Sequence, residues 1–278
     1  MNLRARYLMV FVAATLIPLR APCEGRPDEI PFRLVQGFGI IVKGEVGGIS
    51  NLNILLDTGA VPSVLGVRLA RQMGVSGPVG SFDLAKDRIQ AEYTTVDDLR
   101  IGWIHAKHQS MVIIDLHELE QLLGVRIDAV VGLELFAGQN FGIDYKHRKI
   151  KLGSLGITRH SIPIEIRFAA EAPYCVLPIT INGQQFHVLL DTASNQFALF
   201  QGHTPGHAID SSRNLRTLVP QTMQFVMGDM ALNNQIANVT QEPHGKLGEL
   251  DGVLGPTALH MSRIEFDWEH QCLRWDNE

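Results

Sequence analysis

Ile54-Leu55-Leu56-Asp57-Thr58-Gly59-Ala60 is an apolar run that ends in a carboxylate, followed at once by a hydroxyl and two small residues. A near copy follows later in the chain as Val188-Leu189-Leu190-Asp191-Thr192-Ala193-Ser194. One such triplet of common residues is weak evidence because it recurs by chance. Two copies in matched surroundings indicate an internal repeat and predict two similar structural units.

The surroundings of the two motifs match as well. The first is followed by Asp128-Ala129-Val130-Val131-Gly132 and the second by Asp251-Gly252-Val253-Leu254-Gly255. Each of these segments is followed by a predicted closing hairpin, over residues 141–152 and 263–275. Both halves therefore have the same order: an apolar strand, Asp-Thr-small, a long variable middle, Asp-x-apolar-apolar-Gly and a hairpin.

The length of 278 residues fits one large domain or two of ordinary size, and the repeat favours two. We expect an N-terminal lobe over residues 30–153, a connection over 154–173 and a C-terminal lobe over 174–278. Within the connection, residues 162–166 alternate like a strand, which could join a sheet beneath both lobes. Few long helices are indicated anywhere, so the predicted class is mainly β.

Composition excludes some classes of function. Hydrophobic residues make up 45% of the chain and charged residues 19%, as in a foldable globular protein. The formal net charge is −5, so the chain has no excess of basic residues to bind phosphate backbones. Nucleic acid is therefore not an expected partner.

Residues 1–25 are typical of a signal peptide, with Arg4 and Arg6 before a short apolar centre and small residues at the end. A membrane anchor is the alternative, but the apolar run is shorter than the roughly 20 residues that span a bilayer. We therefore expect an exported protein, periplasmic or secreted, without stable membrane insertion after the signal is removed.

Cysteine and histidine residues suggest no metal or redox centre. Cys175 and Cys272 would pair in an oxidising compartment, or serve as small buried hydrophobes. His105 and His108, like His203 and His207, have spacings that could bind a metal, but no further ligands cluster beside them. They are interpreted as surface histidines.

Local patterns predict short elements between the motifs. Residues 39–48 and 51–56 are typical of strands, and Asn182-Gly183 indicates a hairpin turn. The other expected elements are short helices at 68–74 and 116–123, a projecting hairpin over 81–98 with its tip near 85–88, strands at 99–103 and 111–115, and loops with short strands over 204–235.

The two motif carboxylates are candidates for acid–base catalysis. If the lobes face each other about a twofold axis, Asp57 and Asp191 meet at the junction. Two adjacent carboxyl groups share one proton, so that one apparent pKa rises while the other falls. The ionised member can then take a proton from water, which attacks a peptide carbonyl, while the protonated member supports the oxyanion.

The neighbouring residues fit this task. The hydroxyls of Thr58 and Thr192 can be tied to backbone across the junction. The residues that follow each threonine let backbone amides approach the carboxylates, and two glycines let a second segment pass close behind each loop. These small and supporting residues are Gly59, Ala60, Ala193, Ser194, Gly132 and Gly255.

Together, the repeated Asp-Thr-small motif and the distant apolar-apolar-Gly resemble the aspartic peptidase superfamily over nearly all of the chain that follows residue 30. The Asp57-Thr58-Gly59-Ala60 form resembles the retropepsin-like branch, and two copies in one chain resemble the bilobal arrangement of pepsin. The resemblance implies the acid protease fold, with two similar closed β-barrel-like lobes, a cleft between them and a flap hairpin.

The same resemblance implies an aspartic endopeptidase that hydrolyses polypeptides without metal or cofactor and is inhibited by statine-type transition-state mimics. It also implies a monomer with an intramolecular pseudo-twofold axis. The catalytic pair would be Asp57 and Asp191.

One residue departs from the family pattern. Ala193 stands where the family has glycine, which is costly if the backbone needs a positive φ and harmless if φ is negative. Ser194 can offer its aspartate a hydroxyl hydrogen bond and Ala60 cannot, so Asp191 is predicted to ionise more readily than Asp57.

Three alternatives stay open. Ala193 is the feature that favours a weakened or inactive retropepsin-like protein that only binds peptides. Each aspartate could instead cap a turn at a strand end, as aspartate often does. A secreted β-rich interaction module would place the two carboxylates far apart.

Overall fold

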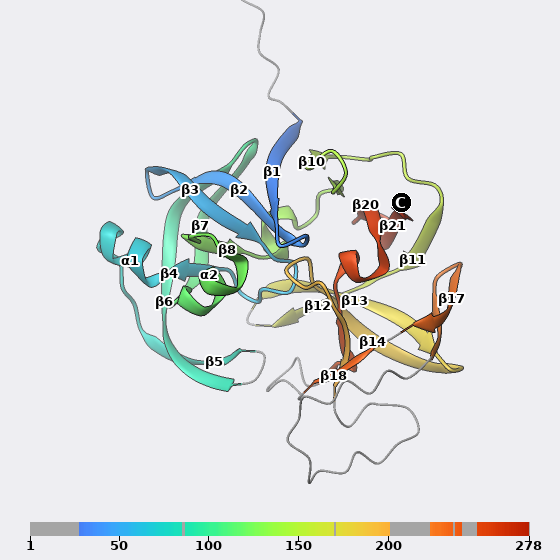
Figure 1. Cartoon of the computed structure of the whole chain (residues 1–278). Helices are drawn as coiled ribbons and strands as arrows, with labels where there is room; N and C mark the ends of the chain where they lie inside the picture. The colour runs from blue at the N-terminus through green and yellow to red at the C-terminus, as the bar shows by residue number, and fades with distance from the viewer. Residues whose placement is uncertain are drawn as a thin grey trace, which may run out of the picture.

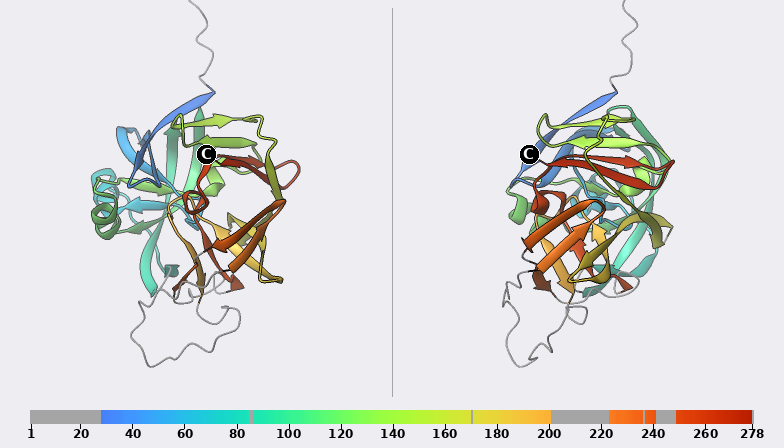
Figure 2. Two further views of the ribbon diagram at one scale, coloured as in Figure 1. Left: turned by 45° about the vertical axis from the view of Figure 1, so that its right-hand side comes forward. Right: turned by 90° about the vertical axis from the view of Figure 1, so that its right-hand side faces the viewer.

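The computed structural model describes residues 28–84, 87–169, 171–200, 223–235, 237–240 and 249–277. Their strands form two hydrogen-bonded sheets, one of thirteen strands and one of eight. The prediction of a mainly β protein is thus confirmed, and Figures 1 and 2 show the short helices at the periphery of the first half. Two closed barrels stay a prediction, because the larger sheet includes strands from both halves of the chain.

The first half of the chain supplies ten strands and the two α-helices among the described residues. Both helices end at a glycine in the left-handed conformation, Gly74 with φ 67° and Gly124 with φ 65°, which is the usual way to satisfy the last carbonyls. The elements are β1 (Glu29–Val35), β2 (Gly39–Val46), β3 (Ile49–Leu56), β4 (Val64–Gly66), α1 (Val67–Met73), β5 (Val79–Leu84), β6 (Asp87–Ile101), β7 (Ile104–Ile114), α2 (His117–Leu123), β8 (Ala129–Val131), the 3-10 turn η1 (Leu133–Phe136), β9 (Phe141–Asp144) and β10 (Lys149–Leu152).

The second half opens with a hairpin at Asn182 and Gly183, whose φ angles of 50° and 81° fit a two-residue turn. This hairpin was predicted from the sequence and is confirmed. The elements are β11 (His160–Pro163), β12 (Glu165–Ala169), β13 (Ala172–Ile181), β14 (Gln184–Leu190), β15 (Phe197–Phe200), β16 (Met223–Met227), β17 (Met230–Gln235), β18 (Asn238–Thr240), β19 (Gly252–Leu254), the 3-10 turn η3 (Pro256–Leu259), β20 (Met261–Asp267) and β21 (Cys272–Asn277).

Most other local predictions are confirmed. The expected helices correspond to α1 and α2, and the projecting hairpin is formed by β5 and β6, which pair up to Leu84 and Asp87. The prediction of a separate strand at 99–103 is wrong, because β6 continues to Ile101 and a tight turn then leads to β7. Residues 85–86 at the hairpin tip, and residues 204–222 in the expected loop region, lie outside the described residues.

The connection between the halves contains two strands rather than one. Ile164 separates β11 from β12, and its N–H donates to the carbonyl of Gln271 instead of joining a ladder. The strand β11 pairs with β21 in the larger sheet, while β12 pairs with β13 in the smaller one. The expectation that this segment joins a sheet shared by both halves is confirmed for β11.

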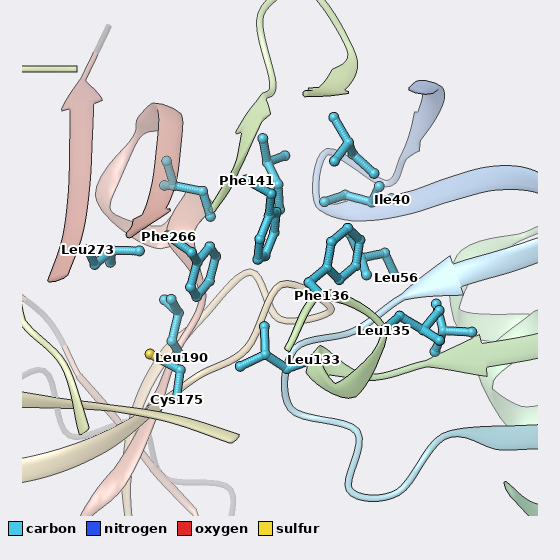
Figure 3. Packing of buried hydrophobic residues seen from close by; sticks show 14 of the residues in the cluster. Ile40, Leu56, Leu133, Leu135, Phe136, Phe141, Cys175, Leu190, Phe266 and Leu273 are labelled. Atoms are coloured by element: carbon cyan, nitrogen blue, oxygen red, sulfur yellow. The ribbon is translucent and has the colours of Figure 1, made fainter. Parts of the chain in front are cut away.

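The two halves meet where β9 pairs with β20, antiparallel, with Ile143 opposite Ile264. Beneath this ladder the rings of Phe136, Phe141 and Phe266 stack, with centroids 4.2 and 4.6 Å apart (Figure 3). All three rings are almost completely buried, so the junction is a continuous hydrophobic core rather than a hinge between independent domains.

Neither cysteine of the described residues forms a disulfide. Cys175 is fully buried on β13 and Cys272 is partly buried on β21, and both are free thiols, which fits the buried-hydrophobe alternative. His105 bonds to Asp98, on the neighbouring strand β6. Within the described ranges, no helix is long and apolar enough to cross a membrane. The predicted signal peptide, residues 1–25, and His203 and His207 fall outside those ranges.

Candidate active site

Asp57 lies just past the end of β3, which pairs in parallel with β8. The N–H of Asp57 donates to the carbonyl of Val131 over 2.9 Å, which extends this pairing by one residue. The chain then turns tightly, because the N–H of Gly59 donates to Oδ1 of Asp57 over 2.8 Å and that of Ala60 donates to the carbonyl of Asp57 over 3.0 Å. The turn fixes the orientation of the carboxyl group.

Asp191 has the same environment in the second half. It follows β14, which pairs in parallel with β19, and its N–H donates to the carbonyl of Leu254 over 3.0 Å. The N–H of Ala193 donates to Oδ1 of Asp191 over 2.7 Å, and that of Ser194 donates to the carbonyl of Asp191 over 3.3 Å. The two sequence motifs therefore form the same local structure.

Two buried threonines join the motifs. The hydroxyl of Thr58 donates to the carbonyl of Leu190 over 2.7 Å and accepts the N–H of Thr192 over 3.1 Å. Reciprocally, the hydroxyl of Thr192 donates to the carbonyl of Leu56 over 3.1 Å and accepts the N–H of Thr58 over 3.0 Å. Four hydrogen bonds across the junction thus hold the two strand ends together.

We expect Thr58→Val to destabilise the protein by about 2–4 kcal/mol, because valine keeps the shape but leaves the N–H of Thr192 and the carbonyl of Leu190 buried without partners. Urea unfolding measures this loss. Thr95→Val, at an exposed position on β6, is the matched control. A loss for Thr58→Val no larger than for the control would show that the threonine bonds do not hold the junction.

The carboxyl groups of Asp57 and Asp191 are hydrogen-bonded to each other, and both side chains are partly exposed. Gly59 lies against this pair: a Cβ on it would come within 3.0 Å of Cγ of Asp191 and 3.2 Å of Oδ1 of Asp57. The structure therefore brings together the two candidate catalytic residues, and the alternative in which they lie far apart is wrong.

The electrostatics of the pair are unequal. Burial and the neighbouring Asp191 carboxylate raise the pKa of Asp57 well above its usual value. Burial also raises the pKa of Asp191, but the hydrogen bonds from Asp57 and from the N–H of Ala193 act in the opposite direction. These directions favour Asp57 as the member that keeps the proton and Asp191 as the more readily ionised one.

This order agrees with the sequence prediction, but the predicted cause is wrong. Among the described hydrogen bonds, the hydroxyl of Ser194 accepts the N–H of Gln196 over 3.2 Å and makes no bond to Asp191. Ser194 therefore supports the turn after the motif and not the carboxylate itself. The difference between the aspartates arises instead from their mutual interaction, which raises the pKa of Asp57 and lowers that of Asp191.

Ala193 is accommodated without backbone strain. It is not among the residues with positive φ, so its N–H remains available to Asp191, as the bond of 2.7 Å shows. Its side chain packs against an apolar cluster of the first half that includes Phe38 and Leu55. The costly alternative for this residue is therefore excluded.

Gly132 and Gly255 lie where a second segment passes close behind each loop. A Cβ on Gly132 would come within 2.4 Å of the carbonyl oxygen of Ala60, and one on Gly255 within 2.0 Å of that of Ser194. No side chain fits in either gap, which explains the glycine at both positions.

Glu134 and Ser63 were not predicted from the sequence. Both lie behind the Asp57 loop, where the N–H of Ser63 donates to Oε1 of Glu134 over 2.9 Å and its hydroxyl accepts the N–H of Gly132 over 2.9 Å. In the second half, the N–H of Gly255 donates to the backbone carbonyl of Gln196 instead. The bridge between Ser63 and Glu134 occurs beside only one of the two motifs, so the repeat carries no signal for it.

Two surface hollows, of about 430 and 630 Å³, lie away from the aspartate pair. The first is lined by residues of α1, β6 and β7, including Arg71, Glu92 and Ile113. The second lies beside Asn140 and Trp268. Neither contains acid–base groups arranged like the pair, and a cleft between the lobes stays a prediction.

The β fold thus holds two adjacent carboxyl groups on paired Asp-Thr turns. Residues 42–135, which include the Asp57 motif, match the family model described as aspartyl protease. A retropepsin-like aspartic protease from Rickettsia conorii is similar in structure at 19% identity, covering 45% of this chain and 89% of that one, with a TM-score of 0.35. No curated protein matches the sequence.

Proposed function

We propose that this protein is an aspartic endopeptidase in which Asp57 and Asp191 activate a water molecule to hydrolyse a peptide bond. The observation that carries the proposal is the hydrogen-bonded carboxyl pair, fixed by matched turns and by the bonds of Thr58 and Thr192. Because both carboxyl groups come from one chain, we propose a two-lobed monomer with a polypeptide substrate between its lobes.

The proposed mechanism assigns each carboxyl a role. Asp191, the more readily ionised member, takes a proton from a water held between the two groups, and the water attacks the peptide carbonyl. Asp57, which holds the shared proton, donates a hydrogen bond to the developing oxyanion. The hydrogen bonds that backbone N–H groups donate to Oδ1 of each aspartate keep these oxygens in place during the reaction.

The observations weaken the alternative of an inactive peptide-binding protein. That alternative rested on Ala193, whose backbone is unstrained and whose N–H still bonds to Asp191.

We also propose export, on the evidence of the signal-like residues 1–25. Mass spectrometry of the protein from its host should then find a new N-terminus near residue 25, and an intact N-terminus would contradict export.

We expect a bell-shaped pH dependence of cleavage, since one shared proton is required. Activity is lost at low pH as Asp191 becomes protonated, and lost as the pH rises through the raised pKa of Asp57. The rate of cleavage of an unfolded protein over this range measures the profile.

A statine-type inhibitor should abolish the activity and a metal chelator should not. Resistance to the statine, or a loss with the chelator, would contradict the proposal.

A further inference from the structure

Glu134, at the start of η1, anchors the backbone behind the Asp57 loop. Its Oε1 accepts the N–H of Ser63 over 2.9 Å, bonds to the Ser63 hydroxyl and receives a longer bond of 3.4 Å from the side-chain amide of Gln109. The Ser63 hydroxyl accepts the N–H of Gly132, so its own proton is directed to Glu134. Glu134, Ser63 and Gly132 are thus locked to one another.

This bridge reaches Asp57 through two short steps. Gly132 directly follows Val131, whose carbonyl accepts the N–H of Asp57. Gly132 also lies so close to Ala60 that a Cβ on it would come within 2.4 Å of the Ala60 carbonyl oxygen. A displacement of Gly132 would therefore move both ends of the turn that orients the Asp57 carboxyl.

Among the described residues, only one oxygen of the Glu134 carboxyl group has hydrogen-bond partners. Its Oε2 is buried and has no hydrogen-bond partner, whereas an ionised oxygen in that position would be left without compensation. Its partners Ser63 and Gln109 are neutral, and the titratable group that faces it is Asp57. Burial raises the pKa of Glu134, whereas the hydrogen bonds from the N–H and the hydroxyl of Ser63 act in the opposite direction.

The second half has no such group at the matching position. Two residues after Gly255 stands Thr257, and Gly255 itself is held by the backbone carbonyl of Gln196 over 2.8 Å. Among the described residues, a titratable side chain therefore braces the Asp57 turn but not the Asp191 turn.

We propose that Glu134 is a positioning residue for Asp57, that it acts in its protonated form, and that its ionisation lowers activity on the alkaline side in addition to the ionisation of Asp57. The consequence for activity rests on the proposed function, whereas the consequence for stability does not. The native state favours neutral Glu134, so its contribution to stability is fully present at low pH and is lost as the pH rises through its raised pKa.

The first test compares thermal unfolding of the wild type and Glu134→Gln across pH 4 to 8, because glutamine resembles the protonated acid. The Tm of Glu134→Gln should rise relative to the wild type with increasing pH. Glu120→Gln is the matched control: Arg68 lowers the pKa of Glu120, so that variant should lose stability relative to the wild type with increasing pH. A constant difference between Glu134→Gln and the wild type would overturn the proposal.

Ser63→Ala provides a second variant. The Ser63 hydroxyl lowers the pKa of Glu134, so its removal should raise that pKa further and move the loss of stability to higher pH. No movement, or movement to lower pH, would also overturn the proposal. This variant serves if Glu134→Gln fails to fold.

The second test is the pH profile of kcat/KM. Above the pKa of Glu134, wild-type activity should fall about tenfold per pH unit relative to Glu134→Gln, and the alkaline limb of Ser63→Ala should move to higher pH. Superimposable alkaline limbs would overturn the role of Glu134 in catalysis. If the wild type shows no cleavage that depends on Asp57, the proposed function is contradicted. The proposal for Glu134 is still tested in that case, since the stability comparison does not depend on activity.

Discussion

Asp57→Asn should reduce kcat for cleavage of an unfolded protein by about 10²–10⁴-fold, the range that a positioned acid–base group contributes. Asparagine keeps an Oδ1 that can accept the N–H of Gly59, so the turn is preserved. What it removes is the proton shared with Asp191, and with it the hydrogen bond that supports the oxyanion.

Initial rates at several pH values, with folding checked by thermal unfolding, measure this effect. Asp97→Asn is the matched control, because Asp97 is highly exposed on β6 and bonds only weakly to His108, over 3.2 Å. If Asp57→Asn cleaves as fast as the wild type, the activity belongs to a contaminant or to another site.

Gly59→Ala should have the second-largest effect, a loss of about 10²-fold in kcat. The added Cβ would lie 3.0 Å from Cγ of Asp191 and 3.2 Å from Oδ1 of Asp57, closer than side chains normally pack. One of the carboxyl groups must therefore shift, and displacements of about 1 Å at a reacting centre cost about 10²-fold.

The matched comparison is Ala193→Gly, at the same position of the second motif. It removes a methyl group that packs against the apolar cluster of the first half, at a cost of about 1 kcal/mol in stability. Its effect on kcat should be much smaller than that of Gly59→Ala. Equal losses for the two variants would show that the close contact of Gly59 with the carboxyl groups is not what matters.

The sequence was sufficient to predict the mainly β class, the short helices and the pairing of Asp57 with Asp191. These features are local or repeated: helices that end at glycine have a clear signal, and a motif that occurs twice reports its own symmetry. The threonine bonds follow from the same repeat. Each threonine hydroxyl has its partners in the other copy of the motif.

Other features depend on contacts between residues far apart in the sequence. Glu134 and Ser63 are separated by 71 positions and have no counterparts in the second half, so the repeat gave no indication of their bridge. The split of the connecting strand at Ile164 is decided by which sheet each part joins. The φ of Ala193 likewise depends on the fold around it and not on residue type.

The most direct measurement of the central claim is a titration of the two carboxyl carbons by NMR, in the wild type and in Asp57→Asn. The account predicts two well-separated apparent pKa values in the wild type, with Asp57 the last to lose its proton, and a changed titration of Asp191 when Asp57 is replaced. Two independent titrations near the ordinary value for aspartate, with Asp191 unaffected by the substitution, would contradict it.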